Sequence, residues 1–123
     1  IRLRGDEVLI CQRRADQPLP LQWEIPGGKV EEPEEPAACL RRELREELDL
    51  EADIGPEVCR FSYQYPGMEP VLLVFFKVTE FRGEPRNRVF ADIRWVPRGR
   101  LPEFDFLAAD KALVQEIARG GLV

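Results

Sequence analysis

Three glutamates, Glu43, Glu46 and Glu47, lie in a stretch that the sequence predicts to be helical. Residues three and four positions apart lie on one face of a helix, so these carboxylates project on the same side. Like charges at this spacing repel one another by roughly 0.2–0.5 kcal/mol per pair, so helix stability alone does not favour them. Mg²⁺ and Mn²⁺ take oxygen ligands, often a few carboxylates together with substrate phosphates. The cluster indicates a divalent-metal site; the alternative is a solvated helix face neutralised by Arg42 and Arg45.

The net negative charge of the chain lies in the same region. The 123 residues include 18 Lys and Arg and 23 Asp and Glu, which gives a net charge of −5. Residues 31–51 alone hold nine of the acidic and three of the basic side chains, a net charge of −6. The rest of the chain is therefore close to neutral, and the acidic segment needs a local explanation.

The chain contains no histidine. This excludes a Ser-His-Asp triad, a His-ligated zinc site and acid–base catalysis by imidazole. The three cysteines, Cys11, Cys39 and Cys59, are widely spaced and form no Cys-x-x-Cys pair. That spacing argues against a disulfide framework or a zinc ribbon and favours a reducing, cytoplasmic setting. Catalysis would then depend on carboxylates, basic groups, Tyr, Cys or a metal held by oxygen ligands.

Apolar spacing, together with Pro and Gly, predicts the elements that position the glutamates. A helix is expected from Pro36 to about Leu48, because Pro36 suits a first helical position and a leucine recurs every fourth residue from Leu40. The predicted strands cover residues 1–4, 7–14, 58–65, 71–81 and 93–96, and a closing helix covers residues 110–119. One helix inserted among strands, with another at the end, indicates a mixed α/β sandwich.

The segment ahead of the helix strengthens the metal-site interpretation. Gly27 and Gly28 permit the backbone to approach a ligand closely, and a carbonyl there could add a neutral oxygen ligand beside the carboxylates. Lys29 follows directly and could meet a phosphate.

With this segment included, the chain resembles the Nudix hydrolases. Their Nudix box is G-x5-E-x7-R-E-U-x-E-E-x-G-U, where U is a bulky aliphatic residue. Here Gly28 is followed after five residues by Glu34, and after seven more by residues 42–50, RELREELDL. Only Asp49 departs from the pattern, where the family has Gly. Asp tolerates the left-handed conformation expected at this helix end better than most residues, so we expect a modest stability cost and an intact metal site.

The resemblance implies a fold, a cofactor and a set of site residues. The fold is a Nudix-type α/β/α sandwich with a mixed β-sheet, a Nudix-box helix and a C-terminal helix, and residues 1–123 form a single Nudix domain whose N-terminal strand is truncated. The cofactor is Mg²⁺, with Mn²⁺ as an alternative. The implied residues are the catalytic and metal-binding Glu43, Glu46 and Glu47, the metal-binding Gly27 carbonyl, the phosphate-binding Arg14 and Lys29, and the structural Gly28, Glu34 and Arg42, of which Glu34 and Arg42 pair.

Further residues are similar to the MutT-like branch, which includes enzymes that cleave 8-oxo-dGTP and CTP-type nucleotides. Residues 23–29, WEIPGGK, and the strand at residues 93–96 follow its order. In that branch the position of Asp110 helps to read the base, whereas a plain helix N-cap is the alternative for this Asp. The branch also has a metal-binding Glu six residues before Trp95, where this chain has Val89; Asp92 could substitute, or the site could hold fewer metals. Phe75, Phe106 and Asp110 are candidates for a base pocket.

The function implied is hydrolysis of a nucleoside triphosphate to monophosphate and pyrophosphate, on an oxidised or non-standard dNTP such as 8-oxo-dGTP or on a CTP-type nucleotide. Such an enzyme would act in nucleotide pool sanitation. The alternatives are a hydrolase of another nucleoside diphosphate linked to X, and a non-catalytic Nudix-fold sensor of a nucleotide or metabolite. With a pI near 4.9 and no basic patch that contains aromatic residues, we expect no nucleic acid polymer as a partner. We also expect no membrane partner. The protein is expected to be a monomer or a homodimer.

Overall fold

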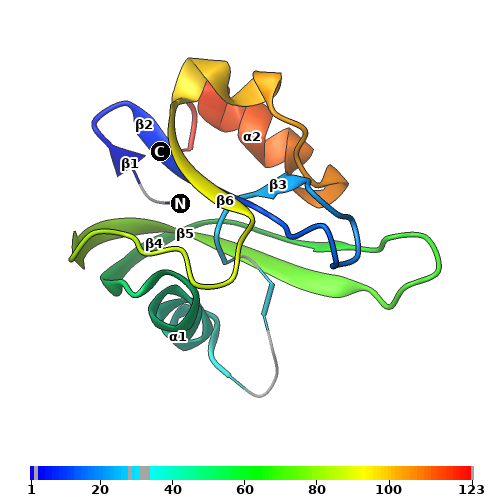
Figure 1. Cartoon of the computed structure of the whole chain (residues 1–123), viewed down its shortest axis with the longest axis horizontal. Helices are drawn as coiled ribbons and strands as arrows, with labels where there is room; N and C mark the ends of the chain where they lie inside the picture. Colours follow the sequence, from blue (N-terminus) through cyan, green and yellow to red (C-terminus); the bar gives the residue numbers. More distant parts are fainter. Residues whose placement is uncertain (2, 28, 31–33, 123) are drawn as a thin grey trace. The chain divides into compact units, whose positions relative to one another are not determined.

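The computed structural model describes residues 1, 3–27, 29–30 and 34–122, and its chain divides into two compact units. One unit is made of Ile1–Pro26 and Asn87–Val123, and the other of Gly27–Arg86. Figure 1 follows the chain through both, from the blue N-terminal strands to the orange C-terminal helix. Each unit is described by itself.

In the unit made of Ile1–Pro26 and Asn87–Val123, the sheet is built around β2 (Glu7–Gln12). β2 pairs antiparallel with β1 (Leu3–Arg4), β3 (Trp23–Glu24) and β6 (Asp92–Pro97). Residues 8–11 are at most 1% exposed, as expected for an apolar run inside a sheet. The strands expected at 1–4, 7–14 and 93–96 are confirmed, with shifted ends.

The same unit carries α2 (Lys111–Ala118), preceded by the short 3₁₀ helices η1 (Arg98–Glu103) and η2 (Ala108–Asp110). The predicted closing helix is therefore confirmed, one residue shorter at each end. Leu113, Val114 and Ile117 bury its apolar face and are at most 4% exposed. The segment before η2 also lies parallel to β3 through a Trp23–Phe106 bridge.

In the Gly27–Arg86 unit, α1 (Pro36–Leu48) has the predicted bounds. Pro36 begins it, and Leu40, Leu44 and Leu48 are at most 5% exposed, so the leucine stripe is the buried face. The helix ends at Asp49, whose φ of 55° and ψ of 38° lie in the left-handed region. The Leu50 N–H then donates to the Leu44 carbonyl at 3.1 Å, which closes the helix end. The expected left-handed Asp49 is confirmed.

Next in this unit, β4 (Glu51–Tyr63) and β5 (Val71–Arg82) form an antiparallel hairpin. The sequence predicted this strand over residues 58–65, but it begins at Glu51 and includes Gly55 and Pro56, which are unfavourable inside a regular strand. The register shifts between Asp53 and Cys59, and these irregularities accommodate both residues within one long strand. A Cβ added to Gly55 would lie 2.7 Å from the Lys77 carbonyl oxygen, so the two backbones approach closely here.

The predicted mixed α/β class is confirmed by these helices and sheets. The sequence missed the two-residue strand β3 and the 3₁₀ helices, which have no periodicity of their own. No helix in the described part of the chain is long and apolar enough to cross a membrane. That residues 1–123 form one domain with a truncated first strand stays a prediction.

Candidate active site

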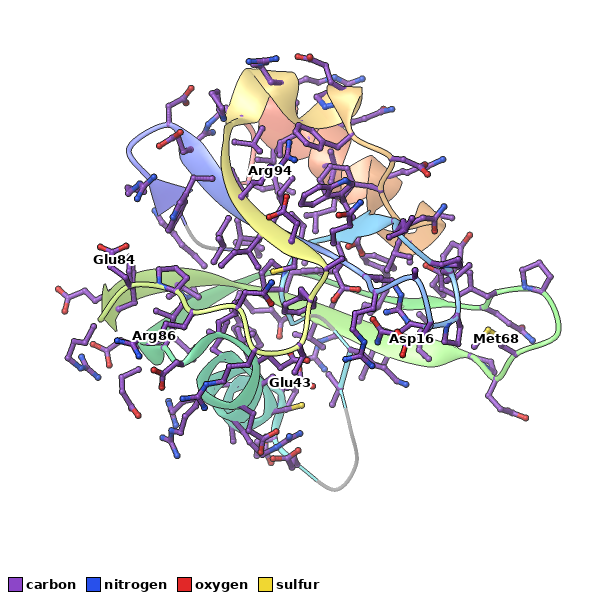
Figure 2. All side chains as sticks on the ribbon, viewed as in Figure 1. Asp16, Glu43, Met68, Glu84, Arg86 and Arg94 are labelled. Carbon is purple, nitrogen blue, oxygen red and sulfur yellow. The ribbon has the colours of Figure 1, made fainter. Side chains whose placement is uncertain are left out.

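The three glutamates all lie on α1, outside its leucine stripe. Glu43 and Glu47 are half-buried and Glu46 is exposed; Glu43 is labelled in Figure 2. The Cys39 sulfur lies 3.5 Å from Oε1 of Glu43, and Nη1 of Arg42 lies 3.0 Å from Oε2 of Glu46. Two of the three carboxylates are therefore held by side chains of the same helix.

The predicted Glu34–Arg42 pair is confirmed. Arg42 Nε lies 2.8 and 3.1 Å from the two carboxylate oxygens of Glu34, and Nη2 lies 2.7 Å from one of them. The hydrogen bonds from Arg42 hold the pKa of Glu34 below its usual value, and those to Glu34 raise the pKa of Arg42. Such a fork fixes the guanidinium and ties the residues before α1 to its second turn.

In the segment ahead of α1, Gly27 has a φ of 83°, and a Cβ there would overlap Cδ1 of Leu40. Only glycine fits this position without strain. Gly28 lies outside the described residues. Lys29 pairs antiparallel with Leu73 of β5, and the Val30 N–H donates to the Leu72 carbonyl at 3.0 Å. The backbone that carries Gly27 is thus fixed against the β4–β5 hairpin.

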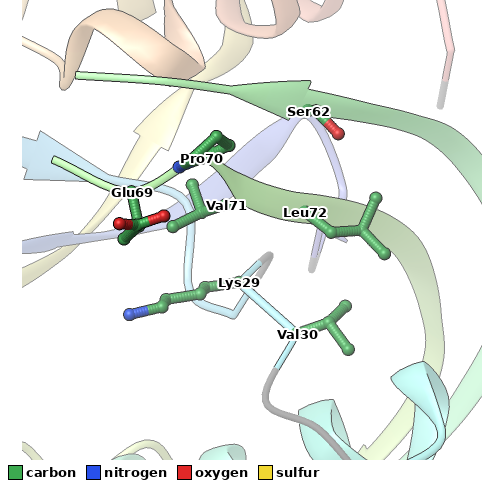
Figure 3. A pocket seen from close by; sticks show the side chains of 7 residues that line it. All are labelled: Lys29, Val30, Ser62, Glu69, Pro70, Val71 and Leu72. Carbon is green, nitrogen blue, oxygen red and sulfur yellow. The ribbon is translucent and has the colours of Figure 1, made fainter. Parts of the chain in front are cut away.

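Lys29 lines an open cavity of about 490 Å³ within the Gly27–Arg86 unit. Figure 3 shows its ammonium and the Glu69 carboxylate on the same side of the cavity, with the Leu72 side chain further along β5. The remaining lining residues are Val30, Ser62, Pro70 and Val71. An exposed ammonium beside an open cavity suits the predicted contact with an anionic ligand.

The predicted phosphate-binding Arg14 belongs to the other unit. Its Nε lies 3.0 Å from Oδ1 of Asp16, and its Nη1 donates to the Val89 carbonyl at 3.1 Å. Val89, where the MutT-like branch has a glutamate, therefore contributes its backbone to this unit's arginine. The Asp92 carboxylate, suggested as a substitute ligand, accepts hydrogen bonds from the Ile93 N–H and from Arg94, both at 2.9 Å.

Asp110 is buried, with 4% of its surface exposed. It occupies the N-cap position of α2 but makes no side-chain capping hydrogen bond. Its Oδ2 accepts instead from the Ile25 N–H at 3.1 Å. The N-cap alternative is therefore wrong for the side chain, because the carboxyl group is turned to the end of β3. Burial raises the pKa of Asp110 to about 7; the Ile25 hydrogen bond opposes this rise and the Glu24 charge adds to it.

The sequence did not single out two further residues near Asp110. They are Glu24, whose charge acts on Asp110, and Arg13, which pairs with Glu24. Arg13 Nη1 lies 3.2 Å from Oε2 of Glu24, and both side chains are about one-fifth exposed, at 22% and 18%. Burial raises the pKa of Glu24, while the charge and hydrogen bond of Arg13 oppose the rise. A signal was present, since Glu24 interrupts an apolar Trp-x-Ile stretch and would be costly to bury alone.

The two aromatic candidates for a base pocket are core residues. Phe75 and Phe106 are each 2% exposed. Phe75 stacks on Phe61 with ring centroids 6.0 Å apart. Both rings therefore contribute to the core, although Phe106 also lines a small cavity beside Phe104 and Lys111.

The candidate residues are thus divided between the two units. The Gly27–Arg86 unit carries the glutamates of α1, Gly27, Lys29 and the Glu34–Arg42 pair, and the other unit carries Arg14 and Asp110. As the side chains stand, no three Asp, Glu, Cys or His residues in the described ranges converge on one metal position. The donor set nevertheless suits a hard divalent ion, because it offers three carboxylates on one helix and a glycine backbone that approaches that helix.

A comparison with protein families decides the identity of the fold: the NUDIX domain model matches residues 1–117. The chain belongs to the Nudix family. Nudix hydrolases generally need a divalent metal, which agrees with the chemistry of the α1 glutamates.

Named relatives lie in the MutT-like branch of this Nudix family. The chain is 32% identical to a Haemophilus influenzae 8-oxo-dGTP diphosphatase over 117 residues, which cover 95% of this chain and 85% of the relative. It is 30% identical to the Escherichia coli CTP pyrophosphohydrolase over 112 residues, 91% of this chain and 82% of the relative. The solution structure of the E. coli ORF135 protein matches with a TM-score of 0.83 at 29% identity, over 97% of this chain and 84% of the other. The predicted resemblance, Nudix fold and hydrolase class are confirmed.

Proposed function

We propose that this Nudix hydrolase converts a nucleoside triphosphate to a nucleoside monophosphate and pyrophosphate. The observation that carries the proposal is the Nudix-box helix α1, on which Glu43, Glu46 and Glu47 share one side and Arg42 is fixed by Glu34. The names of two relatives, 8-oxo-dGTP diphosphatase and CTP pyrophosphohydrolase, support a triphosphate substrate. Oxidised or non-standard dNTPs and CTP-type nucleotides are the substrates that we propose.

Mg²⁺ is the proposed cofactor, with Mn²⁺ able to replace it. Glu43, Glu46, Glu47 and the Gly27 carbonyl would hold it, a set of hard oxygen donors. When bound, the ion neutralises phosphate oxygens and lowers the pKa of a coordinated water.

The protein's own groups would bind and orient the substrate. Lys29 is exposed beside an open cavity, and the Arg14 guanidinium can exchange Asp16 and the Val89 carbonyl for phosphate oxygens. Phosphoryl transfer depends mainly on such positioning and charge neutralisation.

In the reaction, a water oxygen forms a bond to the β-phosphorus and the bond from that phosphorus to the α–β bridging oxygen breaks. The monophosphate leaves with the bridging oxygen, and Glu43 is a candidate to take the proton of the water.

Asp110 is the residue that we propose to contact the base. It is a buried carboxyl group that accepts a hydrogen bond from the Ile25 N–H, and its raised pKa makes both the protonated and the charged form accessible near neutral pH. A protonated carboxyl donates one hydrogen bond and a charged one only accepts, so the two forms would favour different base edges.

A non-catalytic nucleotide sensor is the competing function, and Val89 is the observation that favours it. At this position the MutT-like branch has a metal-binding glutamate, which valine cannot replace. Against the sensor stands the cluster of three glutamates, which a binding protein has no need to keep. A hydrolase of another nucleoside diphosphate linked to X would keep the same α1 residues. The cytoplasmic location and the monomeric or dimeric state stay predictions.

The deciding experiment is a substrate panel with Mg²⁺: NTPs, dNTPs, 8-oxo-dGTP, ADP-ribose and dinucleoside polyphosphates, with monophosphate and pyrophosphate both quantified. The proposal requires equal amounts of the two products from at least one triphosphate. Turnover of only a diphosphate-linked compound would favour the NDP-X alternative. Tight binding of one member without turnover of any would favour the sensor.

A further inference from the structure

Cys39 lies four residues before Glu43 on α1 and is 2% exposed. Its position in the helix places its sulfur on the same side as the Glu43 carboxylate. The sulfur lies 3.5 Å from Oε1 of Glu43, 3.7 Å from the Lys29 carbonyl oxygen and 3.8 Å from Nη2 of Arg42. One buried thiol therefore contacts the Lys29 backbone, the fixed guanidinium and a candidate metal ligand.

We propose that Cys39 is a positioning residue whose thiol, held by Arg42, donates a hydrogen bond to Glu43 and orients that carboxylate for the divalent ion. The proposal rests on the proposed function in one respect: Glu43 must be a group that serves the metal site.

The direction of the hydrogen bonds follows from the groups involved. Arg42 has only donors, so its Nη2 must donate to the sulfur of Cys39. The thiol has a single hydrogen, and the acceptors around it include the Lys29 carbonyl and the carboxylates of Glu43 and Glu34. Both oxygens of Glu34 already accept hydrogen bonds from Arg42. An ionised carboxylate is the stronger acceptor, and a thiol that accepts from a cation is a better donor. The geometry therefore favours two consecutive hydrogen bonds, from the Arg42 guanidinium to the Cys39 sulfur and from the Cys39 thiol to the Glu43 carboxylate.

This series of hydrogen bonds begins at the Arg42 guanidinium, which is held in a fixed position. Glu34 fixes the Arg42 guanidinium through three N–O distances of 3.1 Å or less. From there Nη1 reaches Glu46 at 3.0 Å and Nη2 reaches Cys39. The same guanidinium thus orders one candidate ligand directly and the other through the thiol. Such supporting contacts around metal ligands commonly change metal affinity by about 10–100-fold when removed, and a weak S–H donor belongs at the lower end.

Packing alone is the competing explanation, because a buried cysteine also behaves as a small apolar residue. Three variants separate the two explanations. Cys39→Ala removes donor and volume, Cys39→Val removes the donor but keeps the volume, and Cys39→Ser keeps a donor. Cys11→Ala is the matched control, because Cys11 is equally buried on β2 and belongs to the other unit.

The experiment measures Mn²⁺ binding by electron paramagnetic resonance, with kcat and KM for the best triphosphate alongside. We expect the Mn²⁺ Kd to rise about three- to tenfold in Cys39→Ala and Cys39→Val, to stay within about twofold of the unmodified protein in Cys39→Ser, and to be unchanged in Cys11→Ala. The fall in kcat should match the rise in Kd, with KM for the nucleotide nearly constant. In a Glu43→Gln background, Cys39→Ala should add less than about a twofold change, since the two residues act as one unit.

Two results would overturn the proposal. One is unchanged Mn²⁺ affinity in Cys39→Ala and Cys39→Val. The other is an equal loss in all three Cys39 variants and in Cys11→Ala, which would mean packing only. If the unmodified protein binds Mn²⁺ but cleaves no nucleotide, the proposed function fails while the binding measurements still decide the role of Cys39.

Discussion

The buried carboxyl group of Asp110 accepts a hydrogen bond from the backbone N–H of Ile25, 85 residues earlier in the chain, at 3.1 Å. This contact joins the start of α2 to the end of β3. It also places a second carboxylate, Glu24, close enough to influence the charge of Asp110. A buried carboxyl with a raised pKa makes the stability of its surroundings depend on pH.

Asp110→Asn tests this dependence. Burial raises the pKa of Asp110 from 3.8 to about 7, so the folded protein holds the proton more tightly than the unfolded chain across this window. Its contribution to the free energy of unfolding is therefore complete below about pH 3.8 and is lost as the pH rises to about 7. Asparagine keeps an acceptor for the Ile25 N–H but cannot ionise. We expect the variant to gain stability over the unmodified protein between pH 4 and 8, by an amount on the order of 1–4 kcal/mol in urea unfolding.

Glu116→Gln is the control for this measurement, because Glu116 lies on the same helix but is 53% exposed in its pair with Arg119. It should reproduce the pH dependence of the unmodified protein. Parallel stability curves for Asp110→Asn and the unmodified protein would contradict the prediction.

Arg42→Lys should impair turnover although it keeps the positive charge. A lysine cannot form the fork with Glu34 and at the same time contact Glu46 and the Cys39 sulfur, as Arg42 does. We expect kcat to fall about tenfold or more, with little change in KM. Arg45→Lys is the matched control, since Arg45 is an exposed arginine of the same helix that contacts Glu51. Equal kinetics for the two variants would mean that the Arg42 fork has no role in catalysis.

The sequence could predict what depends on neighbouring residues. The bounds of α1 follow from Pro36, the leucine spacing and the tolerance of Asp49 for a left-handed conformation, and the Glu34–Arg42 pair spans only eight positions. The contacts of Asp110 with Ile25 and of Arg14 with Val89 join residues 85 and 75 positions apart. No local pattern encodes such distances.

Two further predictions differed from the structure for the same reason, the start of β4 and the base-pocket role of two phenylalanines. Gly55 and Pro56 would break an isolated strand, yet bulges opposite β5 accommodate them, and only the partner strand makes this visible. Phe75 and Phe106 are aromatic residues of the kind that line base pockets. Residues distant in the sequence bury them, so both belong to the hydrophobic core.

Glu47→Gln should strongly reduce turnover and leave the fold intact. Glu47 is a half-buried proposed metal ligand on α1, and glutamine has nearly its shape without its charge. We expect kcat to fall on the order of a hundredfold, with an unchanged circular dichroism spectrum. Glu51→Gln, an exposed glutamate just after α1, should keep normal turnover. A Glu47→Gln variant with a near-normal kcat would mean that the metal ligands are assigned incorrectly.

Asp49→Gly should stabilise the protein, because the φ of 55° at this position costs less for glycine than for any residue with a Cβ. The variant loses the contact of Asp49 with Arg86, but that distance is 3.9 Å and Arg86 is 79% exposed, so the lost attraction is small. The closing hydrogen bond from Leu50 to Leu44 uses only backbone atoms and remains. We expect the free energy of unfolding to rise by about 0.5–1 kcal/mol, and Asp49→Ala to lower it, in urea titrations followed by circular dichroism. If both variants were destabilised equally, the side chain of Asp49 rather than its backbone conformation would stabilise the end of α1.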